Sequence, residues 1–94
     1  MILLSPEAAL DIERLRDFLE EKSPNAAKRA LSALWVGVEK LQDFPALGAP
    51  TQDVEVRQLV IRFSSSAYVV RYTELPASKD ILVLRIWHGR EAQW

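Results

Sequence analysis

The sequence predicts an α+β fold in the order β-α-α-β-β-β, with a helix hairpin packed on one face of a small antiparallel sheet. In the first half of the chain, apolar residues recur every three or four positions, which is the period of an amphipathic helix. After residue 56 they alternate with polar residues, which is the period of a strand. Because an apolar helix stripe must be buried, we expect the two helices to cover one face of the sheet.

The chain opens with a short apolar run, Ile2-Leu3-Leu4, that we expect to be the first strand. Ser5 is suited to cap a following helix, Pro6 to its first position and Glu7 to its positive end. We expect this helix to end near Lys22. Its apolar stripe consists of Ala8, Ile12, Leu15, Phe18 and Leu19, with Asp11, Glu13, Arg14, Arg16 and Asp17 on the wet face.

Ser23-Pro24 repeats the cap-and-proline signal, so a second helix should begin there and run to about Asp43. Its apolar positions are Ala27, Ala30, Leu31, Leu34, Trp35, Val38 and Leu41. So short a break between the two helices predicts an antiparallel hairpin.

Phe44 to Pro50 contains two prolines and a glycine and is expected to be a loop. Arg57 to Phe63 then alternates as the second strand, and Tyr68 to Thr73 as the third. Ile81 to His88 is the most apolar run, so we expect it to be the central strand. Short turns between these three strands predict an antiparallel meander.

The 94 residues suffice for a single domain, 1–94, with one core. The absence of cysteine and the single histidine predict no disulfide, metal site or cofactor. The opening apolar run is too short for a signal peptide, and no stretch approaches the roughly 20 apolar residues of a membrane span. We therefore expect a cytoplasmic protein.

The formal net charge of −1 argues against a protein that mainly grips nucleic acid, so we expect direct nucleic-acid binding to be weak or absent. The distribution is uneven, because residues 54–94 carry six basic and four acidic side chains. Arg57, Arg62 and Arg71 could form a modest anion-facing patch in this half, or lie as ordinary charges on a solvated sheet face.

Several segments resemble one known family. Phe63 to Tyr72 followed by Ile81 to Glu91 resembles the C-terminal half of the RelE/ParE toxins, and the closing strand that runs into His88-Gly89-Arg90 is the most specific part. Phe44 to Gly48 resembles the family's proline-glycine loop, and Ser5 to Ala8 the start of its first helix. The resemblance covers essentially the whole chain and is strongest to the ParE branch.

This resemblance implies the toxin of a type II toxin-antitoxin system, neutralised by a cognate ParD-like or similar antitoxin in a toxin-antitoxin hetero-oligomer. Growth inhibition and plasmid stabilisation are the expected biological roles. The family has two main branches. The ribonuclease branch cleaves messenger RNA in the ribosome, whereas the ParE branch poisons DNA gyrase without a known catalytic site in the toxin.

Cleavage of RNA by 2′-hydroxyl attack needs a proton acceptor and several convergent cations. The ribonuclease branch commonly has an arginine where this chain has Val69, and a second basic residue where it has Val60. It also has a C-terminal tyrosine with no counterpart here. These absences favour gyrase inhibition and argue against an enzyme. If the chain is instead an endoribonuclease, we expect the catalytic set His88, Arg62, Arg71 and Arg90.

For gyrase inhibition, the expected target-binding residues are Trp87, His88, Arg90 and Trp94, which combine aromatic area with cationic donors. The alternative is that Trp87 packs in the core and His88 is structural. Expected antitoxin-binding residues are apolar helix positions and arginines of the sheet: Leu15, Phe18, Leu19, Trp35, Arg57, Arg62 and Arg71. Core packing is the alternative for the apolar ones. A third possibility is a non-toxic relative that only binds a protein partner.

Overall fold

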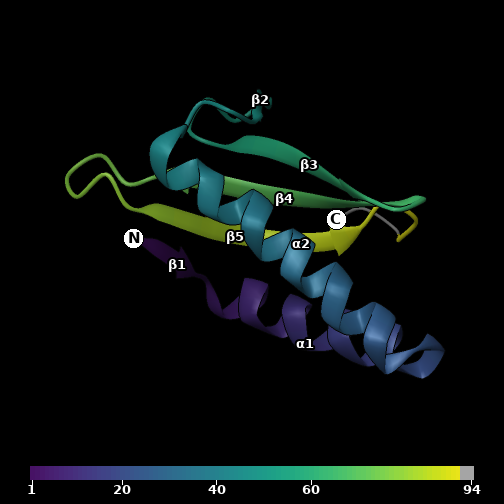
Figure 1. The fold of residues 1–94 in the computed structure, drawn as a ribbon. Helices are drawn as coiled ribbons and strands as arrows, with labels where there is room; N and C mark the ends of the chain where they lie inside the picture. The colour runs from purple at the N-terminus through teal and green to yellow at the C-terminus, as the bar shows by residue number, and fades with distance from the viewer. Residues whose placement is uncertain (92–94) are drawn as a thin grey trace.

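The computed structural model describes residues 1–91 and consists of two helices packed on a five-stranded sheet (Figure 1). The elements are β1 (Ile2–Leu4), α1 (Pro6–Lys22), α2 (Pro24–Asp43), β2 (Ala49–Pro50), β3 (Arg57–Phe63), β4 (Ser66–Glu74) and β5 (Ile81–His88). The α+β class and the six expected elements are confirmed. The additional β2 has only two residues, too few for any periodicity to predict it.

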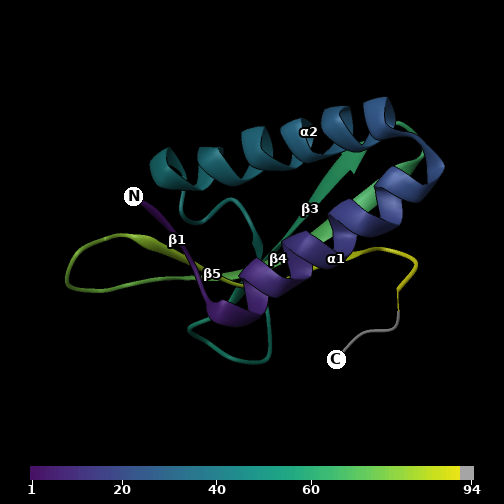
Figure 2. The same ribbon diagram turned by 90° about the horizontal axis from the view of Figure 1, so that it is seen from below.

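Two serines define the helix hairpin. The Ser5 hydroxyl accepts the Ala8 N–H at 3.0 Å and so caps α1. Ser23 ends α1 by donating its N–H to the Leu19 carbonyl at 3.0 Å, and its hydroxyl accepts the Ala26 N–H at 3.3 Å to begin α2. One extended residue therefore separates the helices, which diverge from this corner (Figure 2).

The strand order is β1-β5-β4-β3-β2, and the meander of β3, β4 and β5 is antiparallel as expected. The sheet as a whole is mixed, because β1 pairs with β5 in parallel. The hairpin returns the chain to the end of the sheet where β1 began, so β3 runs in the same direction as β1. Two further reversals give β5 that direction too. The expected wholly antiparallel sheet is therefore corrected at this edge.

The expectation that Ile81–His88 is the central strand is also corrected. β5 lies between β1 and β4, and β4 is third of five. Both strands are interior. Core side chains such as Val70, Val83 and Ile86 point toward the helices, while Val69 and Trp87 are buried on the other face. The apolar richness of β5 therefore indicated an interior strand without specifying its place in the order.

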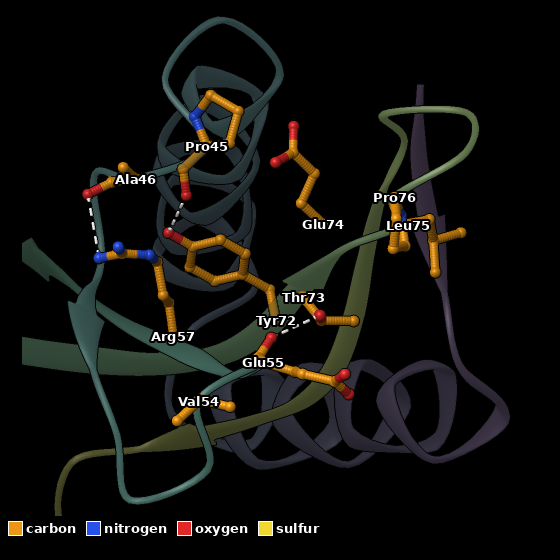
Figure 3. A pocket seen from close by; sticks show the side chains of 10 residues that line it. All are labelled: Pro45, Ala46, Val54, Glu55, Arg57, Tyr72, Thr73, Glu74, Leu75 and Pro76. Atoms are coloured by element: carbon orange, nitrogen blue, oxygen red, sulfur yellow. Dashed lines mark hydrogen bonds between the residues drawn. The ribbon is translucent and has the colours of Figure 1, made fainter.

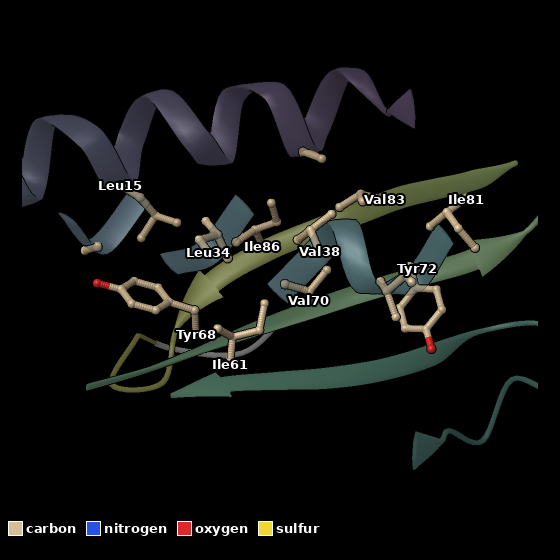
Figure 4. Close-up of a cluster of buried hydrophobic side chains, with 13 residues drawn as sticks. Leu15, Leu34, Val38, Ile61, Tyr68, Val70, Tyr72, Ile81, Val83 and Ile86 are labelled. Carbon is tan, nitrogen blue, oxygen red and sulfur yellow. The ribbon is translucent and has the colours of Figure 1, made fainter. Parts of the chain in front are cut away.

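The core lies between the hairpin and one face of the sheet (Figure 4). Its buried members come from both helices and the three long strands: Ala8, Leu15, Ala30, Leu34, Val38, Leu41, Ile61, Tyr68, Val70, Tyr72, Ile81, Val83 and Ile86. The opposite face carries no helix within the described residues (Figures 1 and 2). Neither helix in this part of the chain is long and apolar enough to cross a membrane.

Candidate functional site: the end of β5

The predicted target-binding residues begin at the end of β5. His88 lies directly opposite Tyr68 in the sheet, so its side chain shares the helix-covered face. Its ring contacts Tyr68 edge-on at a centroid distance of 5.3 Å and lies 6.2 Å from Phe18 of α1. Only 7% of the residue is exposed. His88 is therefore packed between aromatic rings at the margin of the core.

The ring nitrogen of His88 is engaged as an acceptor. The Arg90 backbone N–H donates to Nδ1 at 3.1 Å, so the neutral imidazole carries its proton on Nε2. Gly89 N–H donates to the Ala67 carbonyl at 2.7 Å, and Glu91 N–H to the His88 carbonyl at 2.9 Å. These bonds form a turn that directs the chain away from β5.

Trp87 faces the other side of the sheet, opposite Val69. It is buried, and the Arg71 guanidinium lies over its ring at 5.1 Å from the centroid. Arg71 also donates to the Gln58 side-chain oxygen at 3.0 Å. Arg90 is exposed, whereas Trp94 lies outside the described residues. Within the described segment, Arg90 thus offers its side chain more freely than Trp87 or His88 does.

The structure does not bring the predicted ribonuclease set together. His88 lies on the helix-covered face, while Arg62 and Arg71 alternate onto the opposite face. Tyr68, the nearest phenol to His88, has its pKa raised by burial and so keeps its proton at neutral pH. Within residues 1–91 no three His, Cys, Asp or Glu side chains cluster as a metal would require.

A network of charged side chains lies along the outer edge of β5, and sequence reasoning missed it. Asp11, expected on the wet face of α1, is 2% exposed. Its carboxylate accepts the Ile86 N–H at 2.8 Å, Arg85 at 2.8 and 3.2 Å, and Arg14 at 2.5 Å. Arg14 in turn binds Glu91. Asp11 is buried, contrary to expectation, because its position on α1 faces the edge of β5. Sequence periodicity does not reveal that edge.

The electrostatics of Asp11 follow from these contacts. Burial by itself raises the pKa of a carboxyl group, but the hydrogen bonds from Arg85, the Ile86 N–H and Arg14 outweigh it. The pKa of Asp11 is therefore lower than usual, and the group is ionised at neutral pH. The pKa of Arg14 is raised by its carboxylate partners Glu91 and Asp11, against the effect of burial.

The residues expected to bind an antitoxin divide into accessible and inaccessible ones. Leu15 is 1% exposed and packs in the core, so its side chain offers no surface and this expectation is corrected. Leu19 is partly buried against the same core. Phe18 and Trp35 are exposed, at 43% and 37%. Of the hairpin candidates, these two aromatic residues remain accessible.

The three arginines expected to meet an acidic partner differ in their surroundings. Arg57 donates to the Gly48 carbonyl at 2.8 Å and so anchors the loop before β2. Arg71 is stacked on Trp87, and Arg62 is exposed at the far end of β3. Among the described residues, none of the three forms an ion pair with a carboxylate.

A cleft of about 580 Å³ opens at the other end of the sheet, between the loop after α2 and the end of β4 (Figure 3). The Tyr72 hydroxyl lies at its base, donates to the Pro45 carbonyl at 2.6 Å and accepts the Gly48 N–H at 2.8 Å. Burial raises the pKa of Tyr72. With one hydrogen bond donated and one accepted, this hydroxyl serves to hold the loop.

Comparison with known proteins agrees with this architecture. A family model described as "ParE toxin of type II toxin-antitoxin system, parDE" matches residues 2–93. The chain belongs to this ParE toxin family. Two curated relatives from Caulobacter vibrioides are Toxin RelE1, 38% identical over 96% of this chain and 94% of its own, and Toxin RelE3, 31% identical over 94% and 92%. The resemblance inferred from the sequence is confirmed.

A solved structure supports the fold of this ParE-family toxin. A chain from the chromosomal ParDE toxin-antitoxin system of P. aeruginosa superposes with a TM-score of 0.73 and 22% identity, over 93% of this chain and 92% of that one. The relatives carry RelE names although the family model is that of ParE. The names of the relatives therefore do not distinguish a gyrase inhibitor from a ribonuclease. The geometry at the end of β5 is the observation that bears on this choice.

Proposed function

We propose that this ParE-family toxin inhibits DNA gyrase through the segment from Trp87 to Trp94 and is neutralised by a cognate antitoxin. One observation carries the proposal: the sheet separates His88 from Arg62 and Arg71, so the residues most suited to RNA cleavage do not converge. We infer that a toxin whose described residues hold no convergent catalytic set of this kind acts by binding. Because gyrase works on the chromosome, the proposal places the protein in the cytoplasm.

The energetics of phosphoryl transfer favour the same choice. Each lost transition-state donor costs a ribonuclease on the order of 100-fold in rate. In this chain Val60 and Val69 occupy two positions where the ribonuclease branch has cations, and His88 is buried against Tyr68. The exposed arginine at the end of β5, Arg90, instead suits a binding contact with a protein surface.

The antitoxin is proposed to cover the accessible aromatic residues of the hairpin, Phe18 and Trp35. Large exposed apolar side chains on so small a protein favour a partner surface. An acidic segment of the antitoxin would complement Arg62 and Arg57, which have no carboxylate partner within the described residues.

The test compares two assays with the purified full chain, each with and without the antitoxin. The first measures gyrase supercoiling and the cleavage complex, and the second measures ribosome-dependent cleavage of messenger RNA. We expect inhibition of gyrase, intact messenger, and relief by antitoxin. Messenger cleavage with active gyrase would overturn the proposal in favour of a ribonuclease. A chain that affects neither target and is harmless when expressed alone would be a non-toxic binding relative.

A pair of variants sharpens the comparison. Arg90→Ala should weaken gyrase inhibition about tenfold, because a cationic contact at an interface contributes on the order of 1 to 2 kcal/mol. Arg62→Ala changes another exposed arginine, near the end of β3 and outside the segment from Trp87 to Trp94, and should leave gyrase inhibition unchanged. A ribonuclease would instead lose messenger cleavage in both variants.

A further inference from the structure

The outer edge of β5 lacks a neighbouring strand over much of its length. β1 ends at Leu4, which pairs with Val83, so the backbone from Leu84 onward extends beyond its partner. Side chains take the place of the missing strand. Ser5 Oγ donates to the Leu84 carbonyl at 2.8 Å, Asp11 accepts the Ile86 N–H, and Arg14 Nη2 donates to the Ile86 carbonyl at 3.2 Å.

The last backbone group on this edge is bound by a residue beyond the strand. Glu91 turns back, and its Oε1 accepts the His88 N–H at 2.6 Å. The same carboxylate is held by the Arg14 side chain in a two-pronged contact, Nε to Oε2 at 2.9 Å and Nη2 to Oε1 at 3.2 Å. Glu91 is thereby attached both to the end of β5 and to the middle of α1.

We propose that Arg14 and Glu91 form a clamp that sets the direction in which the chain leaves β5 and thereby presents the C-terminal segment to its target. The two are positioning residues, since they act through Trp87, His88 and Arg90. This proposal rests on the proposed function. Without the clamp, the turn from His88 to Glu91 loses its lateral anchor and must be ordered when the target binds, which lowers affinity.

The clamp is suited to positioning more than to global stability. Its side chains remain partly exposed, 38% for Arg14 and 30% for Glu91, and exposed ion pairs contribute little to stability. Neither residue belongs to the core cluster. The hydrogen bonds that Asp11 accepts from Arg85 and the Ile86 N–H do not involve Arg14. Loss of the clamp should therefore leave the fold intact while freeing the turn.

The experiment measures the concentration of full-length chain that halves gyrase supercoiling. Arg14→Met keeps the aliphatic stem and removes the guanidinium, and Glu91→Gln keeps an acceptor for the His88 N–H but removes the charge. We expect each variant to need about tenfold more protein. The double variant should need no more protein than the weaker of the two single variants, because both substitutions break the same contact between Arg14 and Glu91. Arg16→Met, an exposed arginine of α1 outside the clamp, is the matched control.

Two further readouts separate positioning from a general loss of structure. Amide hydrogen exchange should accelerate at residues 88–91 in both clamp variants and stay unchanged in the strands before residue 88. Affinity for the antitoxin should stay within about twofold of the wild type. Equal potency of wild type and variants overturns the clamp, and so does a parallel loss of potency, antitoxin affinity and strand protection. A wild-type chain that leaves gyrase active overturns the proposed function instead.

Discussion

The carboxylate of Asp11 in α1 accepts the backbone N–H of Ile86 in β5 at 2.8 Å, where the sheet has no further strand to pair with. It therefore accepts the hydrogen bond that the carbonyl of a neighbouring strand would otherwise accept. The same group binds the guanidinium of Arg85 through two hydrogen bonds, at 2.8 and 3.2 Å. A buried helix carboxylate thus completes the sheet edge and fixes α1 against β5.

We predict that Asp11→Ala destabilises the protein by about 3 kcal/mol, because it leaves the Ile86 N–H without its partner and Arg85 without its counter-charge. Asp11→Asn should cost less, since its side-chain oxygen still accepts from Ile86. Chemical denaturation would give both values. Asp17→Asn, on an exposed position of the same helix, serves as control, and equal midpoints for all three variants would contradict the assigned role.

The pH dependence of stability provides a second test of Asp11. Its pKa is lowered in the folded state, so its contribution is present above the unfolded pKa of about 3.9 and is lost as the pH falls through the folded pKa. The difference in unfolding free energy between wild type and Asp11→Asn should be constant above about pH 5 and should shrink in acid. If the difference in unfolding free energy instead grows in acid, the pKa of Asp11 is not lowered by folding and this explanation is excluded.

Local signals explain why the helices and long strands were predictable. Ser5-Pro6 and Ser23-Pro24 each combine a capping hydroxyl with a proline at the first helical position, and both helices begin at those prolines. The alternation in Arg57–Phe63 likewise marks the face that contributes Ile61 to the core. In each case, the residues that specify the element lie close together in the sequence.

The remaining features depend on contacts between distant residues. Asp11 lies 75 positions from Ile86, and Arg14 lies 77 positions from Glu91. Helical periodicity assigns Asp11 to the wet face because it counts polarity and cannot detect a strand edge. The split between His88 and Arg62 depends on tertiary packing in the same way. The functional roles assigned to the candidate residues stay predictions, and their geometry could not be read from the sequence.

Gly37 provides a test of how closely α2 approaches the sheet. A Cβ at this position would lie 2.6 and 2.8 Å from two side-chain carbons of Ile61 in β3. Gly37→Ala should therefore destabilise the protein by about 1 to 2 kcal/mol, even though alanine favours a helix interior. The double variant with Ile61→Val should recover part of this loss. Stabilisation by Gly37→Ala alone, measured by thermal unfolding, would show that the helix has room to spare.

Tyr72→Phe tests the attachment of the loop after α2. The change removes the donor to the Pro45 carbonyl and the acceptor of the Gly48 N–H, so we expect a loss of about 1 to 2 kcal/mol. Amide exchange of Gly48 should accelerate locally. Tyr68→Phe provides a control with the same chemical change in the same strand. If the Gly48 amide stays as protected as in the wild type, another group must hold the loop.

Trp35 tests the proposed antitoxin surface. Its partly exposed ring borders a shallow groove between α2 and β1, with Ile2, Glu39 and Gln42. A large aromatic side chain at a protein interface commonly contributes about 2 kcal/mol, so Trp35→Ala should weaken antitoxin binding roughly 30-fold in calorimetry. Phe44→Ala removes an exposed aromatic ring just beyond α2 and should leave the affinity unchanged. If both variants bind the antitoxin as tightly as the wild type, the antitoxin lies elsewhere. If both lose affinity to the same extent, the binding surface extends past the end of the helix.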